Sequence, residues 1–325
     1  MITVVVPLFN EGESLARLHS ELAAVFDAGA LGPVEFLFVD DGSGDDSWHV
    51  IRALASADPR VRGVRFRRNF GKAAALTSGF LAARGQTVLT LDADLQDDPS
   101  EIPRFLAKLD EGFDVVSGWK RTRHDPWHKV GPSRIFNRMV SALTGCRLHD
   151  HNCGFKGYRR GVLDEVTLYG ELHRFVPVLA FARGFRVAEI EVHHRPRTFG
   201  RSKYGFARFI KGLLDLLTVT FLARFGQRPL HVLGALGLAF IGLGSAGLAY
   251  LAALWLLGHR PIGDRPLLSY SATMLGVGTQ LFSLGILAEL VTAFSIRKAD
   301  TFSVLETVDH RSQAPADEHP SPPSE

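Results

Sequence analysis

This sequence has few cysteines and a small net charge. Only Cys146 and Cys153 occur among its 325 residues, which is too few for a disulfide framework. The chain opens directly on the apolar run Ile2–Val6, so we expect no cleavable signal peptide and a reducing compartment. The formal net charge of +3 is small for this length and gives no support to a nucleic acid-binding surface.

Charged residues are missing from two long stretches near the C-terminus. Val232–Leu257 has none, and Leu267–Phe294 has only Glu289. At a rise of about 1.5 Å per residue, each stretch is long enough to cross a hydrocarbon core of about 30 Å. The short link His259–Pro266 therefore predicts a transmembrane hairpin, with helices at about residues 230–257 and 267–294. The alternative, a helical hairpin buried in a soluble core, is disfavoured by two such segments in succession.

Basic residues flank the outer ends of this hairpin. Their bias favours a multi-pass protein of the cytoplasmic membrane with both termini in the cytoplasm. The residues concerned are Arg224 and Arg228 before the hairpin, and Arg297 and Lys298 after it. Glu289 is either a functional intramembrane acid or a side chain that reaches the interface, and the sequence leaves this open.

A Gly-x-Gly-x-x-Gly pattern at Gly242–Gly247 lies inside the first apolar segment, without a strand before it. Close helix packing explains these glycines better than a dinucleotide site does. Residues 205–228 before the hairpin predict an amphipathic helix in the bilayer interface, although an ordinary surface helix would look similar. From about Asp309 the chain is rich in Pro, Ser, Asp and Glu, which predicts that the cytoplasmic tail at residues 297–325 is largely disordered.

The first 204 residues have the pattern of a soluble α/β domain. Short apolar runs alternate with helical segments, which predicts a mostly parallel sheet with helices on both faces. The predicted strands are Ile2–Val6, Glu35–Val39, Val61–Phe66, Thr87–Leu91, Asp114–Ser117 and Arg186–Val192.

Polar side chains follow three of these strands at the point where each strand ends. They are Asn10 and Glu11, then Asp40 and Asp41, then Asp92 and Asp94. At a single strand end, such acids would be read as helix caps. Because the carboxyl ends of parallel strands meet at one edge of a sheet, three ends predict a shared site there.

The stretch Asp92-Ala-Asp94-Leu-Gln96 offers carboxylate and amide oxygens within five residues. Hard oxygen ligands of this kind suit Mg²⁺ or Mn²⁺, which are often shared with substrate phosphates. The alternative is a polar loop whose Asp98-Pro99 pair only starts the next helix, Ser100–Leu109.

Four motifs in this order resemble the inverting family 2 glycosyltransferases with the GT-A fold. Within that family, the chain is most similar to the polyprenyl-phosphate branch that includes dolichol-phosphate mannosyltransferase. The motifs are Val-Val-Pro7-Leu-Phe-Asn10-Glu11, Val-Asp40-Asp41-Gly-Ser, Asn69-Phe-Gly-Lys72 and Asp92-Ala-Asp94-Leu-Gln96. The resemblance implies a Rossmann-like GT-A catalytic domain at residues 1–204, followed by the interfacial helix 205–228 and the two helices within 229–296.

The resemblance also implies roles for individual residues. Asp92, Asp94 and Gln96 would hold Mg²⁺ or Mn²⁺ on the diphosphate of a nucleotide sugar, with Asp94 also counted as catalytic. This fits the chemistry, because a divalent ion stabilises the charge of a departing nucleoside diphosphate. The residues expected at the nucleotide are Pro7, Asn10, Glu11, Asp40 or Asp41, Lys72 and Asp92.

The resemblance places an acceptor-side site after residue 118. Arg123 and Arg134 would contact phosphate, whereas Lys120 stands where the family more often has Arg. A solvated basic loop is the alternative for this stretch.

Asp150 would line the acceptor side, either as a base or as an orienting group. The spacing Cys146-x-x-His149-x-His151-x-Cys153 also invites zinc, but it matches no usual zinc pattern.

Arg197-Thr-Phe-Gly-Arg201-Ser202-Lys203-Tyr resembles the family motif Arg-x-x-Gly-x-Ser-Lys-Tyr. Arg201, Ser202 and Lys203 would then form a lid with phosphate donors, and a basic linker before the membrane is the alternative.

Together these features predict a metal-dependent hexosyltransferase. It would move a hexose from UDP- or GDP-linked sugar to polyprenyl phosphate, in a pathway of the cell envelope. The alternatives are a transferase acting on a glycolipid or polysaccharide, and a catalytically silent nucleotide-sugar-binding membrane module. Whether the chain forms a homo-oligomer is left open.

Overall fold

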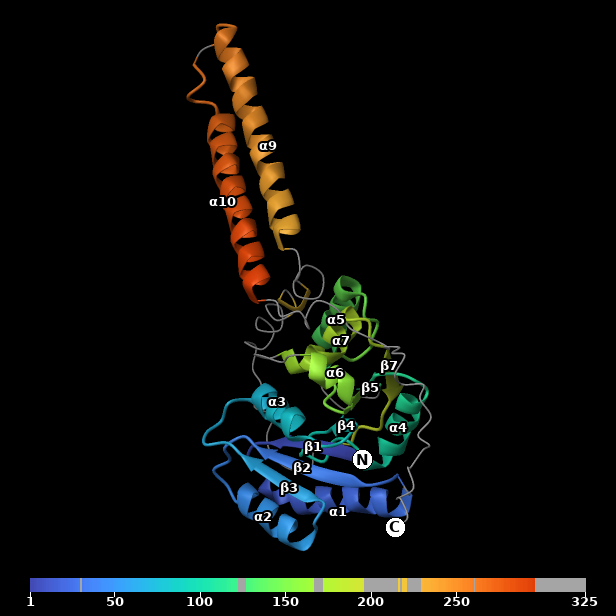
Figure 1. Cartoon of the computed structure of the whole chain (residues 1–325). Helices are drawn as coiled ribbons and strands as arrows, with labels where there is room; N and C mark the ends of the chain where they lie inside the picture. The colour runs from blue at the N-terminus through green and yellow to red at the C-terminus, as the bar shows by residue number, and fades with distance from the viewer. Residues whose placement is uncertain are drawn as a thin grey trace, which may run out of the picture.

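A mixed sheet of seven strands forms the centre of the α/β domain (Figure 1). The computed structural model describes residues 1–29, 31–121, 127–166, 172–195, 216, 218–220, 229–259 and 261–295. Within the described residues, the strand order is β3-β2-β1-β4-β6-β5-β7, and β6 runs antiparallel to its two neighbours, β4 and β5. The strands are β1 (Ile2–Leu8), β2 (Val34–Asp40), β3 (Val61–Arg65), β4 (Thr87–Thr90), β5 (Val115–Trp119), β6 (Lys156–Arg159) and β7 (Val187–Glu191).

Helices cover both faces of this sheet, which explains why β1 and β4 are buried along their whole length. Leu18 of α1, Ile51 of α2 and Phe105 of α4 belong to the core on one face. Leu76 of α3, Val162 of α6 and Val176 of α7 belong to the core on the other. The helices are α1 (Gly12–Gly29), α2 (Ser47–Ala57), α3 (Lys72–Ala82), α4 (Ile102–Asp110), α5 (Trp127–Thr144), α6 (Arg160–Glu165) and α7 (Val176–Ala182), with 3₁₀ turns η1 (Pro99–Glu101) and η2 (Leu172–Phe175).

The predicted α/β class and the mostly parallel sheet are confirmed, with all six predicted strands present to within a few residues. Strand β6 was not predicted, because Lys156–Arg159 is only four residues long and two of them are basic. It becomes a strand because it pairs with both β4 and β5. Helix α5 was also not predicted, since its start lies in the stretch that reads as a basic loop.

The predicted hairpin is present as α9 (Pro229–Leu256) and α10 (Pro266–Ser295), which run side by side and project away from the sheet (Figure 1). Glycines let the two helices approach closely. A Cβ atom on Gly237 would lie 2.7 Å from the Gly278 carbonyl oxygen, and one on Gly244 would lie 2.7 Å from that of Ser271. The helix-packing interpretation of Gly244 is therefore confirmed.

Glu289 lies near the end of α10, and its side chain caps the start of α9. Its Oε2 accepts a hydrogen bond from the backbone N–H of Leu230 at 3.1 Å. The first N–H groups of a helix have no partner within the helix, and the helix dipole favours a carboxylate there. The structure thus gives Glu289 a capping contact between the two helices.

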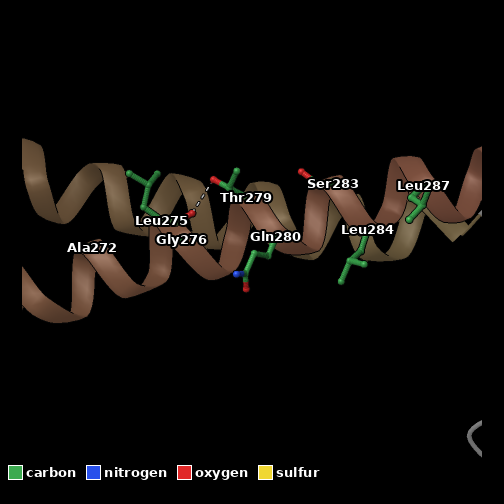
Figure 2. Close-up of a pocket in the computed structure, with 8 residues that line it drawn as sticks. All are labelled: Ala272, Leu275, Gly276, Thr279, Gln280, Ser283, Leu284 and Leu287. Carbon is green, nitrogen blue, oxygen red and sulfur yellow. Dashed lines mark hydrogen bonds between the residues drawn. The ribbon is translucent and has the colours of Figure 1, made fainter.

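A shallow hollow of about 800 Å³ lies along α10 (Figure 2). Gln280 and Ser283 lie on this exposed side, whereas Gly278 and Gly285 are buried. The side chain of Thr279 donates to the Leu275 carbonyl at 2.8 Å, within the helix. Helix α10 therefore carries a polar stripe on a different side from its buried glycines. The lining residues are Ala272, Leu275, Gly276, Thr279, Gln280, Ser283, Leu284 and Leu287.

Only four residues of the predicted interfacial helix are described, namely 216 and 218–220. Leu216 and Val219 are buried in a cluster with Val140 of α5 and Phe175 of η2. This short piece packs on the α/β domain, while the rest of residues 205–228 and the tail 297–325 lie outside the described residues.

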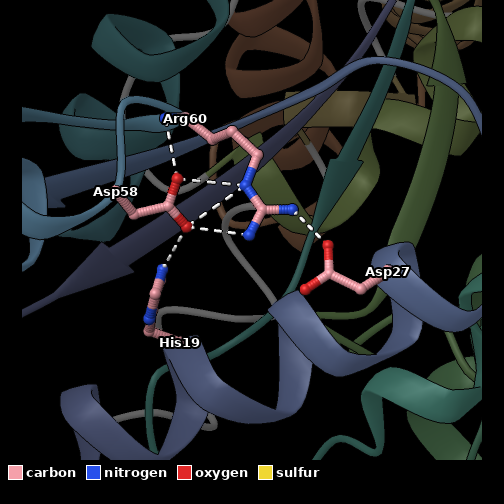
Figure 3. A network of polar contacts seen from close by, with 4 residues as sticks. All are labelled: His19, Asp27, Asp58 and Arg60. Carbon is pink, nitrogen blue, oxygen red and sulfur yellow. Dashed lines mark hydrogen bonds and ion pairs between the residues drawn. The ribbon is translucent and has the colours of Figure 1, made fainter.

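A polar network ties α1 to the start of β3, at the amino-terminal edge of the parallel strands (Figure 3). Asp58 accepts hydrogen bonds from the Arg60 guanidinium at 2.9 to 3.1 Å and lies 3.0 Å from His19 Nε2. Arg60 also pairs with Asp27 at 2.7 Å. The hydrogen bonds from Arg60 lower the pKa of Asp58 from 3.8 to about 2, even though burial opposes this shift.

We expect Asp58→Asn to lower the free energy of unfolding by up to about 2 kcal/mol at pH 7. The contribution of a carboxylate with a depressed pKa is fully present above its unfolded pKa and disappears as the pH falls toward 2. Thermal melts should therefore show a difference from the unsubstituted protein that is constant from pH 7 to 5 and narrows below about pH 4. Asp27→Asn, at a partner that is 64% exposed, should have a much smaller effect. An equal loss in both variants would contradict this assignment.

Candidate active site

The loop after β1 is joined to the loop after β2 by hydrogen bonds from backbone N–H groups. Asn10 N donates to Ser43 Oγ at 2.9 Å, and Glu11 N donates to Ser47 Oγ at 3.0 Å. Asn10 Oδ1 in turn accepts from Gly44 N at 2.9 Å, and Asn10 has a left-handed φ of 56°. Pro7 is buried in β1 beside Val39 of β2. The predicted nucleotide-side residues Pro7, Asn10 and Glu11 thus lie at the predicted edge of the sheet.

Asp40 and Asp41 are both buried, and their carboxylates accept hydrogen bonds from the protein itself. Asp40 Oδ1 accepts from Ser43 N at 2.8 Å, and Asp40 Oδ2 lies 3.3 Å from Arg65 Nε. Asp41 accepts from the N–H groups of Phe70 at 2.7 Å and Gly71 at 2.9 Å. These contacts hold the two loops in place, and contact of either residue with a base or ribose stays a prediction.

Gly42 lets these loops pack against each other. A Cβ atom there would lie 2.4 Å from the carbonyl carbon of Arg68, and its φ of 74° is in the left-handed region. A residue with a side chain would therefore push the loop after β2 away from the turn that precedes α3.

Lys72 and Asp92 come from different strand ends and form an ion pair. Lys72 is the first residue of α3, directly after the Gly71 that Asp41 holds, and its Nζ lies 2.5 Å from Asp92 Oδ1. Both side chains are about one-third exposed, at 34% and 33%. Burial by itself would raise the pKa of Asp92, but the charge and hydrogen bond of Lys72 bring it down to about 2.

The loop 92–97 presents the predicted metal ligands. Asp94 is buried except for 8% of its surface, and its Oδ1 accepts from Gln96 N at 3.2 Å. Between them, Leu95 has a left-handed φ of 61° and is buried in the core. Such strain in a non-glycine residue persists only where the surrounding packing imposes it, and it is common at functional sites.

The chemistry of this donor set fits Mg²⁺ or Mn²⁺. The residues that the structure describes contain no group of three or more His, Cys, Asp or Glu side chains able to hold a metal by themselves. Mg²⁺ is usually bound by one or two carboxylates, with substrate phosphates and water completing its shell. Asp92 and Asp94, with the amide of Gln96, supply such a partial shell.

Lys120 and Asp97 form a second ion pair, which is buried beneath the loop. Lys120 Nζ lies 2.7 Å from Asp97 Oδ1, and the two side chains are 14% and 0% exposed. Although burial by itself would lower it, the carboxylate of Asp97 raises the pKa of Lys120 above its ordinary value. The ammonium group of Lys120, which stands where the family more often has Arg, is thus directed to a protein carboxylate.

Residues 194–195, which follow β7, bind the loop 92–97. Arg195 N donates to the Gln96 carbonyl at 2.9 Å, and His194 forms a β-bridge with Asp97. The Arg195 guanidinium pairs with Asp98 at 2.8 Å and with Glu21 of α1 at 2.6 Å. The segment that leads into the predicted lid, Arg201, Ser202 and Lys203, therefore starts beside the predicted metal ligands.

Asp150 lies in a buried turn held by Glu189 of β7. The Glu189 carboxylate accepts from His149 N at 3.0 Å and from Asp150 N at 2.9 Å. Asp150 Oδ1 accepts from Asn152 N at 3.0 Å, and its surface is 1% exposed. This arrangement suits a fixed orienting carboxylate.

The zinc interpretation of the Cys146–Cys153 stretch finds no support in the described residues, which contain no candidate metal cluster. His151 Nε2 lies 3.0 Å from Ser141 Oγ, and burial lowers the pKa of its imidazole to about 4. Burial raises the pKa of both thiols to about 12, so each cysteine is a protonated core residue at neutral pH.

Two further basic side chains lie near Asp92. Lys156 is 3% exposed and hydrogen-bonds the Cys153 carbonyl. His173 of η2 lies close to Lys72, and burial together with the charges of Lys72 and Arg174 lowers its pKa to about 2. His173 is therefore a neutral imidazole among cations.

Four of the predicted residues lie outside the described residues, namely Arg123, Arg201, Ser202 and Lys203. Arg134 belongs to α5, but its side chain is not described. The structure thus brings together the residues predicted to bind the nucleotide and the metal, and their roles, like those of the arginines and the lid, stay predictions.

Sequence reasoning missed several residues that shape this site. Asp97 had the clearest signal, because it directly follows Gln96 of the predicted metal-binding motif, yet it reads as part of the polar loop before the next helix. Gly154 packs so closely that a Cβ atom would lie 2.8 Å from Asp92 Oδ2. Glu189, His173 and Arg195 carried no signal, since only the fold brings them near residues 92–97 and 150.

Comparison with known proteins shows the family of this chain. A family model described as Glycosyl transferase family 2 matches residues 3–167. Dodecaprenyl-phosphate galacturonate synthase of Rhizobium johnstonii is 35% identical over 320 residues, covering 96% of this chain and 94% of that protein.

Solved structures of glucosyl-3-phosphoglycerate synthase from Mycobacterium tuberculosis have a similar fold. The complex with Mn²⁺, UDP and phosphoglyceric acid matches with a TM-score of 0.53 and 21% identity, over 68% of this chain and 78% of that one. The complex with phosphoglyceric acid gives 0.53 and 22%, over 68% and 80%. At this identity the likeness concerns the fold alone, and it confirms the expected GT-A-like architecture.

Proposed function

This chain belongs to glycosyl transferase family 2, and on that premise we propose that it transfers a hexose to polyprenyl phosphate. The donor would be a UDP- or GDP-linked sugar, and the reaction would invert the sugar carbon. A place within the dolichol-phosphate mannosyltransferase branch stays a prediction.

The observation that carries this proposal is the similarity to dodecaprenyl-phosphate galacturonate synthase along 96% of the chain. The similarity extends beyond the catalytic domain into the region of α9 and α10, which could span a membrane. A membrane hairpin suits an enzyme whose acceptor is itself a membrane lipid, because it keeps the catalytic domain at the surface where the lipid phosphate lies.

The chemistry of the donor fits the edge of the sheet. Transfer breaks the bond between the sugar carbon and the diphosphate, and negative charge develops on the departing nucleoside diphosphate. Asp92, Asp94 and Gln96 would hold Mg²⁺ or Mn²⁺, which neutralises that charge when bound. Lys72, held beside Asp92, would place a further positive charge at the same diphosphate. Pro7, Asn10, Glu11, Asp40 and Asp41 would border the nucleotide.

The chemistry of the acceptor removes the need for a strong base. By analogy with phosphoamino acids, a lipid phosphate has a second pKa near 6, so its attacking oxygen is mostly deprotonated at neutral pH. Asp150, fixed by Glu189, would then orient the acceptor or the sugar. Arg123, Arg134, Arg201, Ser202 and Lys203 would bind the acceptor phosphate and close over it.

We further propose that residues 1–204 form the catalytic domain on the cytoplasmic face of the cytoplasmic membrane. Residues 205–228 would connect it to the hairpin within 229–296, and residues 297–325 would return to the cytoplasm. Basic residues at both outer ends of the hairpin support this orientation.

The full chain, purified in detergent with Mn²⁺ and a short polyprenyl phosphate, should move label from one of a panel of UDP- and GDP-sugars into lipid. The panel should include UDP-galacturonate, because of the similarity to the Rhizobium protein. Asp94→Asn should reduce transfer by about 10² to 10³, as loss of a group that stabilises a transition-state charge does. Asp164→Asn, an exposed acid on α6, should transfer normally.

Other outcomes of this assay discriminate between the alternatives. Metal-dependent nucleotide binding without transfer to lipid would favour a glycolipid or polysaccharide acceptor. Neither transfer nor nucleotide binding would favour a catalytically silent membrane module and would sink the proposal.

We expect Asp150→Asn to slow transfer by about 10 to 100-fold, with a loss that does not change with pH above about 7. The reason is that the phosphate acceptor carries no proton for a base to remove. The measurement is kcat from pH 6 to 9, with a thermal melt to check folding at this buried position. Recovery of the variant at high pH would instead identify Asp150 as a base.

The proposed orientation can be checked by labelling introduced cysteines in intact cells, because both natural cysteines are buried. Gly263→Cys, in the exposed link between α9 and α10, should react with a membrane-impermeant maleimide from outside. Gly161→Cys, at an exposed position on α6, should react only after the cells are opened. The reverse pattern would place the catalytic domain on the other side of the membrane.

A further inference from the structure

The Lys72–Asp92 pair puts a protein cation on a residue expected to bind a metal ion. Lys72 Nζ lies 2.5 Å from Asp92 Oδ1, within the distance of a direct charge-assisted hydrogen bond. Asp92 also has Gly154 packed against its carboxylate, which narrows the space around it. A divalent ion that approached Asp92 with Lys72 in place would meet a positive charge at close range.

The backbone of Lys72 is fixed, whereas its side chain has room to move. Asp41 binds the N–H groups of Phe70 and Gly71 immediately before Lys72, at 2.7 and 2.9 Å. The Lys72 side chain is 34% exposed and carries its ammonium group on a flexible four-carbon stem. It could therefore change partners without any rearrangement of the loops.

The charges near Asp92 favour such a change once a donor substrate binds. Lys156 lies close enough to Asp92 and Lys72 for their charges to interact, and His173 lies there as a neutral imidazole. A divalent ion added alone at Asp92 would be repelled by the nearby ammonium groups of Lys72 and Lys156. A nucleotide sugar brings a diphosphate, whose oxygens would accept hydrogen bonds from Lys72 while the ion takes its place on Asp92.

We propose that Lys72 exchanges partners, neutralising Asp92 before substrate binds and moving to the donor's diphosphate when the divalent ion occupies Asp92. This inference rests on the proposed function, because it assumes a nucleotide-sugar donor and a metal site at Asp92. Its consequence is an order of binding: the ion binds weakly alone and tightly together with the nucleotide.

The test is the affinity for Mn²⁺ alone, measured by the electron paramagnetic resonance signal of free Mn²⁺ titrated with the full chain. Lys72→Met should bind Mn²⁺ more tightly than the unsubstituted protein, on the order of tenfold, because one repelling charge is gone. With saturating Mn²⁺, the same variant should bind UDP and GDP more weakly. Opposite changes in the two affinities are expected only if Lys72 serves both partners.

Two control variants test whether the effect comes from the positive charge at residue 72. Lys72→Arg retains the positive charge and should not tighten Mn²⁺ binding. Lys108→Met removes a partly exposed lysine on α4 that pairs with Glu111, and both affinities should stay unchanged. Thermal melts of all variants establish that they fold, and Lys72→Gln provides a second uncharged side chain.

Unchanged or weaker Mn²⁺ binding by folded Lys72→Met and Lys72→Gln would overturn the exchange. The exchange would also be overturned if the double variant, Lys72→Met with Asp92→Asn, bound Mn²⁺ more tightly than Asp92→Asn alone. The gain in Mn²⁺ affinity must act through the Asp92 carboxylate, which is missing from both of these proteins. Failure of the metal site itself would look different, since Asp92→Asn alone would then leave Mn²⁺ affinity unaltered.

Discussion

The candidate active site depends on hydrogen bonds that join the loops at the carboxyl edge of the parallel strands. Asp41 binds the turn before α3, and Asn10 and Ser43 join the loop after β1 to the loop after β2. These bonds bring Lys72 to Asp92, although the two residues are 20 positions apart in the sequence. A buried carboxylate that accepts two backbone N–H groups holds a loop more firmly than loop residues alone can.

The other half of the site is built from segments that arrive later in the chain. Strand β6 inserts antiparallel between β4 and β5, and with it Gly154 packs against Asp92 and Lys156 lies close to Asp92. Residues 194–195 bind the loop 92–98, and Glu189 holds the turn of Asp150. The site is thus shared between the parallel half of the sheet and a mixed half, which would separate a nucleotide side from an acceptor side.

The hairpin of α9 and α10, which is long and apolar enough to span a membrane, is held together differently from the α/β domain. Its helices meet through Gly237, Gly244 and Gly278, where side chains would clash, and Glu289 caps the start of α9 from the end of α10. In a bilayer, close packing and satisfied polar groups hold helices together. The surrounding lipid tails are as apolar as the helix surfaces, so the hydrophobic effect does not drive the helices together.

The sequence by itself determined six of the seven described strands, the hairpin, the polar strand ends and the family, because apolar periodicity, segment length and short motifs are local properties. It did not determine β6, since Lys156–Arg159 has no strand pattern and pairs only because β4 and β5 flank it. It named Asp92 and Lys72 separately, but only the tertiary structure decided that they pair, that Asp97 holds Lys120, and that Glu189 holds Asp150. Contacts between residues distant in sequence depend on how the loops pack, and no local pattern encodes that packing.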